Sequence, residues 1–132
     1  MTADSLPAVI GLVQMGVLEL HTWGAKRDGL DRPDPIIVDL DPDPIVTWKR
    51  VIEAAQLVRT LLNELDLECF VKLTGGKGLH VVLPLRRVHT WDEVKAFSKG
   101  LADHLVRLIP DRFIANMSKR KRKGKIYIDC FA

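Results

Sequence analysis

Two aspartates separated by one residue are the clearest candidates for chemistry in this sequence. Asp39 and Asp41 follow the apolar run at 36–38, whose β-branched residues favour a buried strand. Alternate side chains of a strand share a face, so the two carboxylates should point the same way while Leu40 faces the core. Carboxylates this close repel each other unless a cation lies between them, and their oxygens suit Mg²⁺ or Mn²⁺. The alternative is a strand ending in an acidic turn, because Pro42 follows at once.

A glycine-rich segment and a second acidic strand end add further candidates. Residues 74–80 read Thr-Gly-Gly-Lys-Gly-Leu-His. Glycines let backbone N–H groups turn toward an anion, and Lys77 and His80 add donors. The segment is neither a Walker P-loop nor a dinucleotide fingerprint, so a plain hairpin turn is the alternative. Asp129 ends an apolar run at 126–128 and, with Asp39 and Asp41, would make a reasonable two-metal site.

The run at 118–125 is strongly basic, and the formal net charge of the chain is +3. This charge permits a nucleic-acid partner, and the position of the run before the Asp129 strand favours phosphate contact. The alternative is a solvated loop. His21 lies at the end of a short alternating segment, where a lone histidine is more often structural than catalytic.

Hydrophobic periodicity predicts the elements that would position these groups. We expect a short helix within 8–15 and a strand at 17–21, then a strand from 36, a helix over 48–65 capped by Thr47, strands at 69–71 and 79–85, a helix over 91–109 and a strand at 126–129. Thr90 and Glu93 form a capping-box pattern before the second long helix.

The order from residue 36 is β-α-β-β-α-β, which predicts an α+β ferredoxin-like or RRM-like core with one extra N-terminal strand at 17–21. In that order the strand carrying Asp39 and Asp41 lies between the strand of His80 and the strand of Asp129. Three carboxylates and a histidine should therefore share one sheet surface.

The chain of 132 residues is 47% hydrophobic, enough for one modest core, so we expect a single domain over 1–132. Cys69 and Cys130 fall in apolar segments without a CxxC partner, which predicts reduced core thiols. No secretory signal or bilayer-spanning apolar stretch is present in the sequence. These features predict a cytoplasmic protein, associated with the nucleoid if DNA is its partner, and no membrane partner.

Four segments at 12–21, 39–42, 74–80 and 124–129 together resemble the polymerase domain of bacterial DNA ligase D, a member of the archaeo-eukaryotic primase superfamily. The similarity runs from about Leu12 to Asp129. It implies a primase-type catalytic core that acts as a template-dependent nucleotidyltransferase, extending primers and filling gaps during non-homologous end joining. It also implies two Mn²⁺ or Mg²⁺ ions per site and a preference for ribonucleotides. The implied partners are NTP or dNTP, primer-template or gapped DNA, DNA ligase and Ku-like proteins.

The resemblance also assigns roles by position. Asp39, Asp41 and Asp129 correspond to the catalytic, metal-binding carboxylates. The implied nucleotide-binding residues are His21, Thr74, Gly75, Gly76, Lys77, His80, Arg122 and Lys125. Lys119, Arg120 and Lys121 are the candidates for nucleic-acid contact.

The sequence departs from the family pattern on both flanks, which are missing here. After Asp129 the family continues with an aromatic residue, an apolar residue, arginine and asparagine, whereas this chain reads Cys130-Phe131-Ala132. Two alternatives therefore stay open: a catalytically weak or inactive nucleotide- or nucleic-acid-binding module or fragment, and another metal-dependent phosphoryl-transfer enzyme such as a nuclease. An unpaired sheet edge at the last strand would favour a homodimer.

Overall fold

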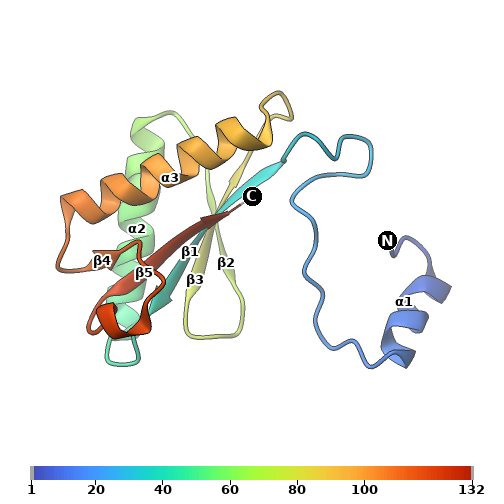
Figure 1. Ribbon diagram of the computed structural model, residues 1–132, viewed down its shortest axis with the longest axis horizontal. Helices are drawn as coiled ribbons and strands as arrows, with labels where there is room; N and C mark the ends of the chain where they lie inside the picture. Colours follow the sequence, from blue (N-terminus) through green and yellow to red (C-terminus); the bar gives the residue numbers. More distant parts are fainter. Residues whose placement is uncertain (1, 132) are drawn as a thin grey trace.

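The computed structural model describes residues 2–131, and Ala132 lies outside the described part. Its five strands form one sheet in the order β2-β3-β1-β5-β4. The strands are β1 (Pro35–Pro42), β2 (Phe70–Leu73), β3 (Leu79–Pro84), β4 (Phe113–Ile114) and β5 (Ile126–Phe131). Helices α2 (Trp48–Glu64) and α3 (Trp91–Leu108) cover one face of this sheet (Figure 1). The predicted α+β class and the β-α-β-β-α-β order are confirmed, with β1 between β3 and β5.

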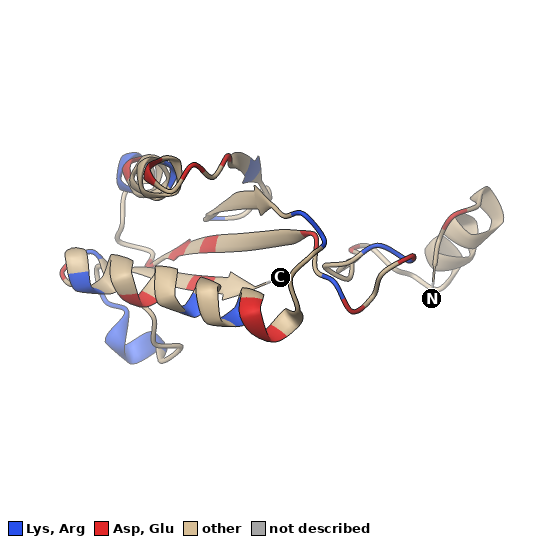
Figure 2. Cartoon of the chain, turned by 90° about the horizontal axis from the view of Figure 1, so that it is seen from above, with Lys and Arg blue, Asp and Glu red and all other residues tan. Residues whose placement is uncertain are grey.

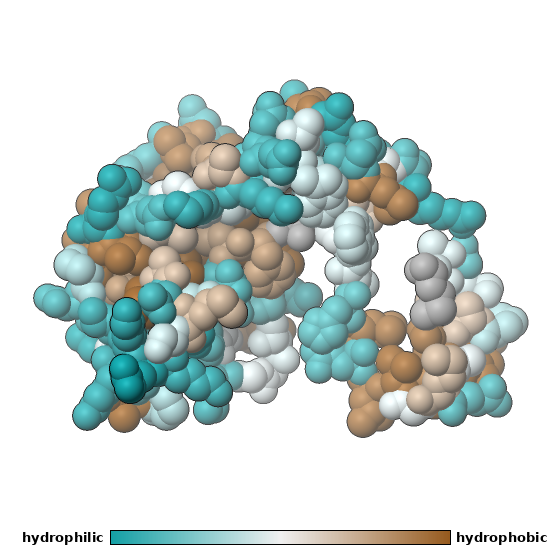
Figure 3. Space-filling model, viewed as in Figure 1, coloured by the Kyte–Doolittle hydropathy of each residue, from teal (hydrophilic) through white to brown (hydrophobic). Residues whose placement is uncertain are grey.

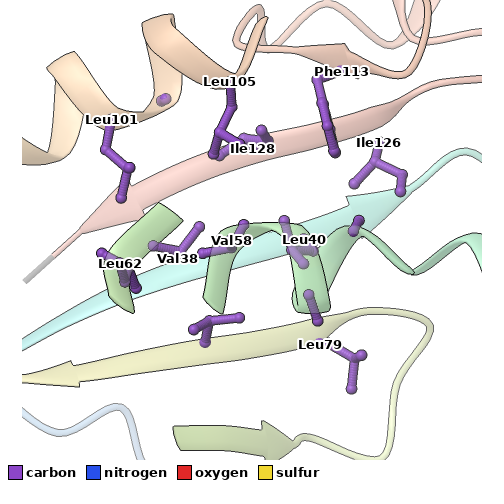
Figure 4. Packing of buried hydrophobic residues seen from close by; sticks show 14 of the residues in the cluster. Val38, Leu40, Val58, Leu62, Leu79, Leu101, Leu105, Phe113, Ile126 and Ile128 are labelled. Carbon is purple, nitrogen blue, oxygen red and sulfur yellow. The ribbon is translucent and has the colours of Figure 1, made fainter. Parts of the chain in front are cut away.

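Alternate residues of the central strand β1 lie in two different environments, one under the helices and one on the opposite face of the sheet. Ile36, Val38 and Leu40 are 0–1% exposed and pack under the helices. Their partners include Val58, Leu62, Leu101 and Leu105, and Figure 4 shows these side chains converging from both layers. The intervening residues of β1, among them Asp39 and Asp41, are only half-buried. The opposite face of the sheet, which we call the open face, therefore carries the polar groups.

The helix boundaries follow the sequence signals closely. Thr90 and Glu93 form the expected capping box at the start of α3. Thr47 occupies the N-cap position of α2, but its side chain makes no capping hydrogen bond. No helix among residues 2–131 is long and apolar enough to cross a membrane. Cys69 and Cys130 are free thiols at the margin of the core, and burial raises the pKa of Cys130 to about 12.

The extra strand expected at 17–21 is wrong. Residues 17–23 form no ladder, and Leu18 and Leu20 are exposed. Helix α1 (Leu6–Gln14) precedes this segment and lies away from the sheet (Figure 1), and Figure 3 shows its surface as largely hydrophobic. Alternation alone did not make a strand here, because a strand also requires a partner edge.

Strand β4 was not predicted. Its two residues pair in parallel with the first two residues of β5 and so cover part of the edge expected to be unpaired. Strand β2 forms the opposite edge of the sheet.

The loop at 24–34 is tied to the segment at 85–91, which connects β3 to α3. The Trp91 Nε1–H donates to the Leu30 carbonyl at 2.9 Å, and Arg32 donates to the Val88 carbonyl at 2.8 Å. Arg87 and Asp28 form an ion pair, and hydrogen bonding from Arg87 lowers the pKa of Asp28. These contacts fix the path by which the chain enters β1.

Candidate active site

The strand register places the predicted acidic residues on one surface. Asp39 of β1 lies directly opposite His80 of β3 on one side and Asp129 of β5 on the other. Directly opposed residues of antiparallel strands share a face, and Asp41 shares it by its spacing of two. The open face therefore carries Asp39, Asp41, Asp129 and His80, as expected, and Figure 2 shows acidic positions on these strands.

Asp39 is a half-buried carboxylate in a crowded acidic environment. Burial raises the pKa of Asp39, and the negative charges of Asp41 and Asp129 raise it further. His80 acts in the opposite direction, with its Nε2 lying 3.5 Å from an Asp39 oxygen. The other ring nitrogen of His80 is buried and has no hydrogen-bond partner among residues 2–131. A carboxylate crowded in this way is stabilised by any cation that approaches it.

Arg122 supplies such a cation to Asp41. Its Nη1 donates to Asp41 Oδ2 at 2.9 Å, and its Nη2 donates to the Met117 carbonyl at 2.9 Å. The guanidinium lies 3.9 Å from the centroid of the Tyr127 ring, and the side chain is only 14% exposed. The resemblance placed Arg122 at the nucleotide, whereas here it contacts a candidate metal ligand.

The donor set suits a hard divalent cation, since it consists of carboxylates that repel one another on a partly dehydrated surface. Within residues 2–131, however, no three histidine, cysteine or acidic side chains converge closely enough to hold a metal ion as they stand. Asp41 is turned to Arg122 instead. For a metal ion to bind here, Asp41 would have to release Arg122 and contact the ion instead.

The glycine-rich segment forms the β2–β3 hairpin beside these carboxylates. Gly75 has a φ of +80°, which favours glycine. Gly78 approaches β1 so closely that a Cβ would overlap the Leu40 carbonyl oxygen and come within 3.6 Å of an Asp39 carboxylate oxygen. Thr74, Gly76 and Lys77 are exposed around this turn. The hairpin backbone is therefore held against the acidic surface.

The remaining candidate residues are His21, Lys125 and the three basic residues at 119–121. His21 is exposed and pairs with Glu19 at 3.3 Å, making no contact with the three carboxylates in the described chain. Lys125 donates to the Pro110 carbonyl at 2.8 Å, which gives it a structural role. Lys119, Arg120 and Lys121 are exposed on the short helix η1 (Lys119–Lys121), the blue turn beside the sheet in Figure 2.

Tyr127 is the site residue that the sequence interpretation overlooked. It lies opposite Asp41 in the β1–β5 register and forms the surface on which Arg122 rests. Burial raises the pKa of its hydroxyl, and the charge of Asp129 adds to this effect. Its spacing of two from Asp129 was the available signal, because that spacing puts both on the open face.

Two helices cover one face of an antiparallel-centred sheet, and acidic side chains lie in register on the other face, so the chain is an α+β domain with a carboxylate-bearing sheet surface. The family model for the LigD primase-polymerase domain matches residues 1–131. The chain belongs to the LigD primase-polymerase domain family.

Individual relatives agree with this assignment. The chain is 53% identical over 125 residues to a multifunctional non-homologous end joining protein LigD of Pseudomonas aeruginosa, covering 95% of this chain and 15% of that protein. It is 32% identical to the Mycolicibacterium smegmatis LigD over 89% of this chain and 16% of that protein. A solved polymerase domain of Mycobacterium tuberculosis ligase D in complex with DNA matches with a TM-score of 0.70 and 31% identity, covering 74% of this chain and 34% of that one. The chain thus spans a small part of the length of these relatives.

Proposed function

We propose that residues 1–132 are one primase-polymerase-like catalytic core domain that joins nucleotides to a primer strand on a DNA template during end-joining repair. The observation that carries this proposal is the register of Asp39 with His80 and Asp129 on the open face. The family assignment supports the same reaction class. The substrates would be NTP or dNTP, with ribonucleotides favoured, and primer-template or gapped DNA.

In this reaction the primer 3′-hydroxyl attacks the α-phosphorus of the nucleotide, and pyrophosphate leaves. Two bound Mn²⁺ or Mg²⁺ ions would supply Lewis-acid assistance to the hydroxyl and charge neutralisation at the pyrophosphate. Asp39, Asp41 and Asp129 would be the ligands of those ions. His80 would orient Asp39, to which it is already adjacent at 3.5 Å. Thr74 and the hairpin N–H groups at 75–78 would hold the phosphates, with Lys77 beside them.

The DNA partner would be a duplex end carried along the same surface. The solved relative in complex with DNA supports DNA as the partner. Because the relatives are end-joining proteins, we also propose a cytoplasmic, nucleoid-associated location and co-operation with DNA ligase and Ku-like proteins. Homodimerisation stays a prediction, with sedimentation velocity as its test.

Arg122→Gln should tighten the binding of Mn²⁺ in the absence of nucleotide. Arg122 and a metal ion compete for Asp41, and removing a charged hydrogen bond of roughly 1.5 kcal/mol corresponds to about tenfold in affinity. Calorimetric titration with Mn²⁺ would measure this change. Arg120→Gln is the matched control, because Arg120 is exposed and makes no ion pair in the described chain. Unchanged or weaker binding in Arg122→Gln would contradict competition at Asp41.

Changing Lys119, Arg120 and Lys121 to glutamine should flatten the salt dependence of DNA binding. Each lost phosphate contact lowers the slope of log K against log salt by about 0.7–0.9, so three contacts predict a change of about two to three. Fluorescence anisotropy over a salt series measures the slope. The control removes three exposed cations from α2 instead, namely Lys49, Arg50 and Arg59. If both triple variants keep the wild-type slope, the basic turn is merely solvated.

Primer extension tests the proposed function directly. A labelled primer-template, Mn²⁺ and ribonucleotides should yield template-dependent extension by the whole chain. Binding of the same DNA without extension under either metal would favour the second candidate, a nucleotide- or nucleic-acid-binding module. The ion pair between Arg122 and Asp41 favours that second candidate, since it engages a required metal ligand.

A further inference from the structure

Trp23 lies beside Pro35, Val82 and Pro84, at the end of the open face where β1 begins, and the residue is 71% exposed. Its ring meets Trp91 of α3 edge to face, with centroids 5.8 Å apart and an interplanar angle of 71°. Trp91 is itself fixed by its hydrogen bond to the Leu30 carbonyl. The anchored Trp91 ring thus restricts the motion of the exposed Trp23 ring. A ligand that stacks on Trp23 would therefore cause a smaller loss of side-chain conformational entropy.

Trp23 lines two open hollows. One has a volume of about 380 Å³ and is lined on the sheet side by Pro35, Val82 and Pro84, and on the loop side by Thr22, Trp23, Ala25, Lys26 and Asp34. The other, of about 360 Å³, is lined by Thr22, Trp23, Gly24, Trp91 and Lys95. Lys26 and Lys95 are exposed and make no ion pair within residues 2–131. Each hollow therefore combines an aromatic surface with an available cation.

The larger hollow begins close to the acidic surface, because Val82 is one of its lining residues. Val82 shares the open face with His80 and is two residues further along β3, a separation of about 7 Å. That is about two steps of stacked bases along a nucleic-acid strand. The basic turn η1 and Arg122 lie toward the other end of β1, where Arg122 contacts Asp41. Carboxylates thus lie between a cationic end and an aromatic end of one surface.

We propose that Trp23 is a stacking site for an unpaired nucleobase of the nucleic-acid strand that crosses the open face. Aromatic rings with flanking cations are the chemistry by which single strands are bound without sequence preference. Lys26 would contact a phosphate next to the stacked base, because it lines the hollow that includes the open-face residues Val82 and Pro84. Asp34 disfavours a phosphate inside the larger hollow, so a base is the better occupant there. This inference rests on the proposed function for its partner and adds a site that the catalytic groups do not include.

The test measures binding of a labelled short oligothymidylate, and of the same strand with abasic sites, to the whole chain without nucleotide. Trp23→Ala should weaken oligothymidylate binding by about five- to 100-fold, as expected for the loss of one stacked base. Trp23→Phe should retain most of the affinity, because it keeps a ring. Trp48→Ala is the matched control, since Trp48 is 47% exposed at the start of α2 and should leave binding within about twofold of wild type. On the abasic strand, wild type and Trp23→Ala should bind equally.

Three results would overturn the proposal: equal affinities of Trp23→Ala and Trp48→Ala, an equal loss on the abasic strand, or no binding of oligothymidylate by wild type. Primer extension with the same preparations separates this proposal from the proposed function. If wild type and Trp23→Ala both extend the primer and bind the primer-template with equal affinity, the stacking proposal fails and the polymerase proposal stands. If binding depends on Trp23 but wild type does not extend the primer, the polymerase proposal fails and the stacking proposal stands.

Discussion

Asp39→Ala should abolish primer extension and also the rise in melting temperature that Mn²⁺ causes in the wild type. Asp39 is the carboxylate in register with both His80 and Asp129, so its loss removes the centre of the donor set. A ligand present at 100 times its Kd stabilises the native state by about 2.7 kcal/mol, which for a domain of this size is on the order of 10 °C. The rate of extension should fall by at least about 10²-fold. Thermal melting with and without Mn²⁺ and gel-resolved extension measure the two effects.

Asp103→Ala is the control for Asp39→Ala. Asp103 is an acidic residue on α3 that pairs with Lys99 at 3.3 Å, and α3 covers the face opposite the carboxylates. Its variant should keep both the Mn²⁺ shift and the extension activity. An equal Mn²⁺ shift in Asp39→Ala and wild type would eliminate Asp39 as a metal ligand.

Removing the charge of Asp39 should stabilise the protein when no metal is present. Burial and the nearby carboxylates raise the pKa of Asp39, so the fold disfavours its ionised form. A raised carboxyl pKa gives stability that is present at low pH and lost as the pH rises through the folded value. At neutral pH the charge therefore destabilises the fold, and Asp39→Asn should melt above wild type when no metal is added.

Gly78→Ala should destabilise the fold and also impair extension. A Cβ at Gly78 would overlap the Leu40 carbonyl oxygen, and a backbone group cannot move aside as a side chain can. Either the hairpin or β1 must shift, at a cost of about 1–3 kcal/mol, which is typical of overpacking. Because Leu40 lies between Asp39 and Asp41, that shift would displace the carboxylates. Urea denaturation gives the stability change and primer extension the functional one.

Gly76→Ala provides the comparison in the same hairpin. A Cβ there would meet only Thr74 Oγ1, at an ordinary contact distance of 3.6 Å. Gly76→Ala should therefore unfold within about 0.5 kcal/mol of wild type. A Gly78→Ala variant that denatures like wild type would mean that the hairpin is not held against β1.

The sheet order was predictable because burial on one face leaves a strong periodic signal. Residues 38–41 alternate between apolar and acidic after an apolar run, and the two long helices repeat apolar residues at steps of three and four. The segment at 17–21 alternates equally well, yet it forms no ladder because no strand edge lies beside it. Strand β4 has two residues, too few for any period, and forms only where the chain passes β5.

The site was predictable in part for the same reason. Strand alternation put Asp39 and Asp41 on one face, and the strand order brought His80 and Asp129 beside them. The partner of Arg122 could not be read in this way, because a basic run has no burial pattern to show which residue turns inward. Arg122 is selected by the Met117 carbonyl and the Tyr127 ring, which only the folded chain brings together.

The pairing of β1 with β5 also determines when the acidic surface can exist during synthesis. Asp39 is translated 90 residues before its partner Asp129, which belongs to the last strand of the described sheet. The β1–β3 pairing can form on the nascent chain, but contacts between such distant segments form late and slowly. A nascent chain thus cannot assemble all three carboxylates, and the proposed metal ions could be bound by all three only after β5 has been translated.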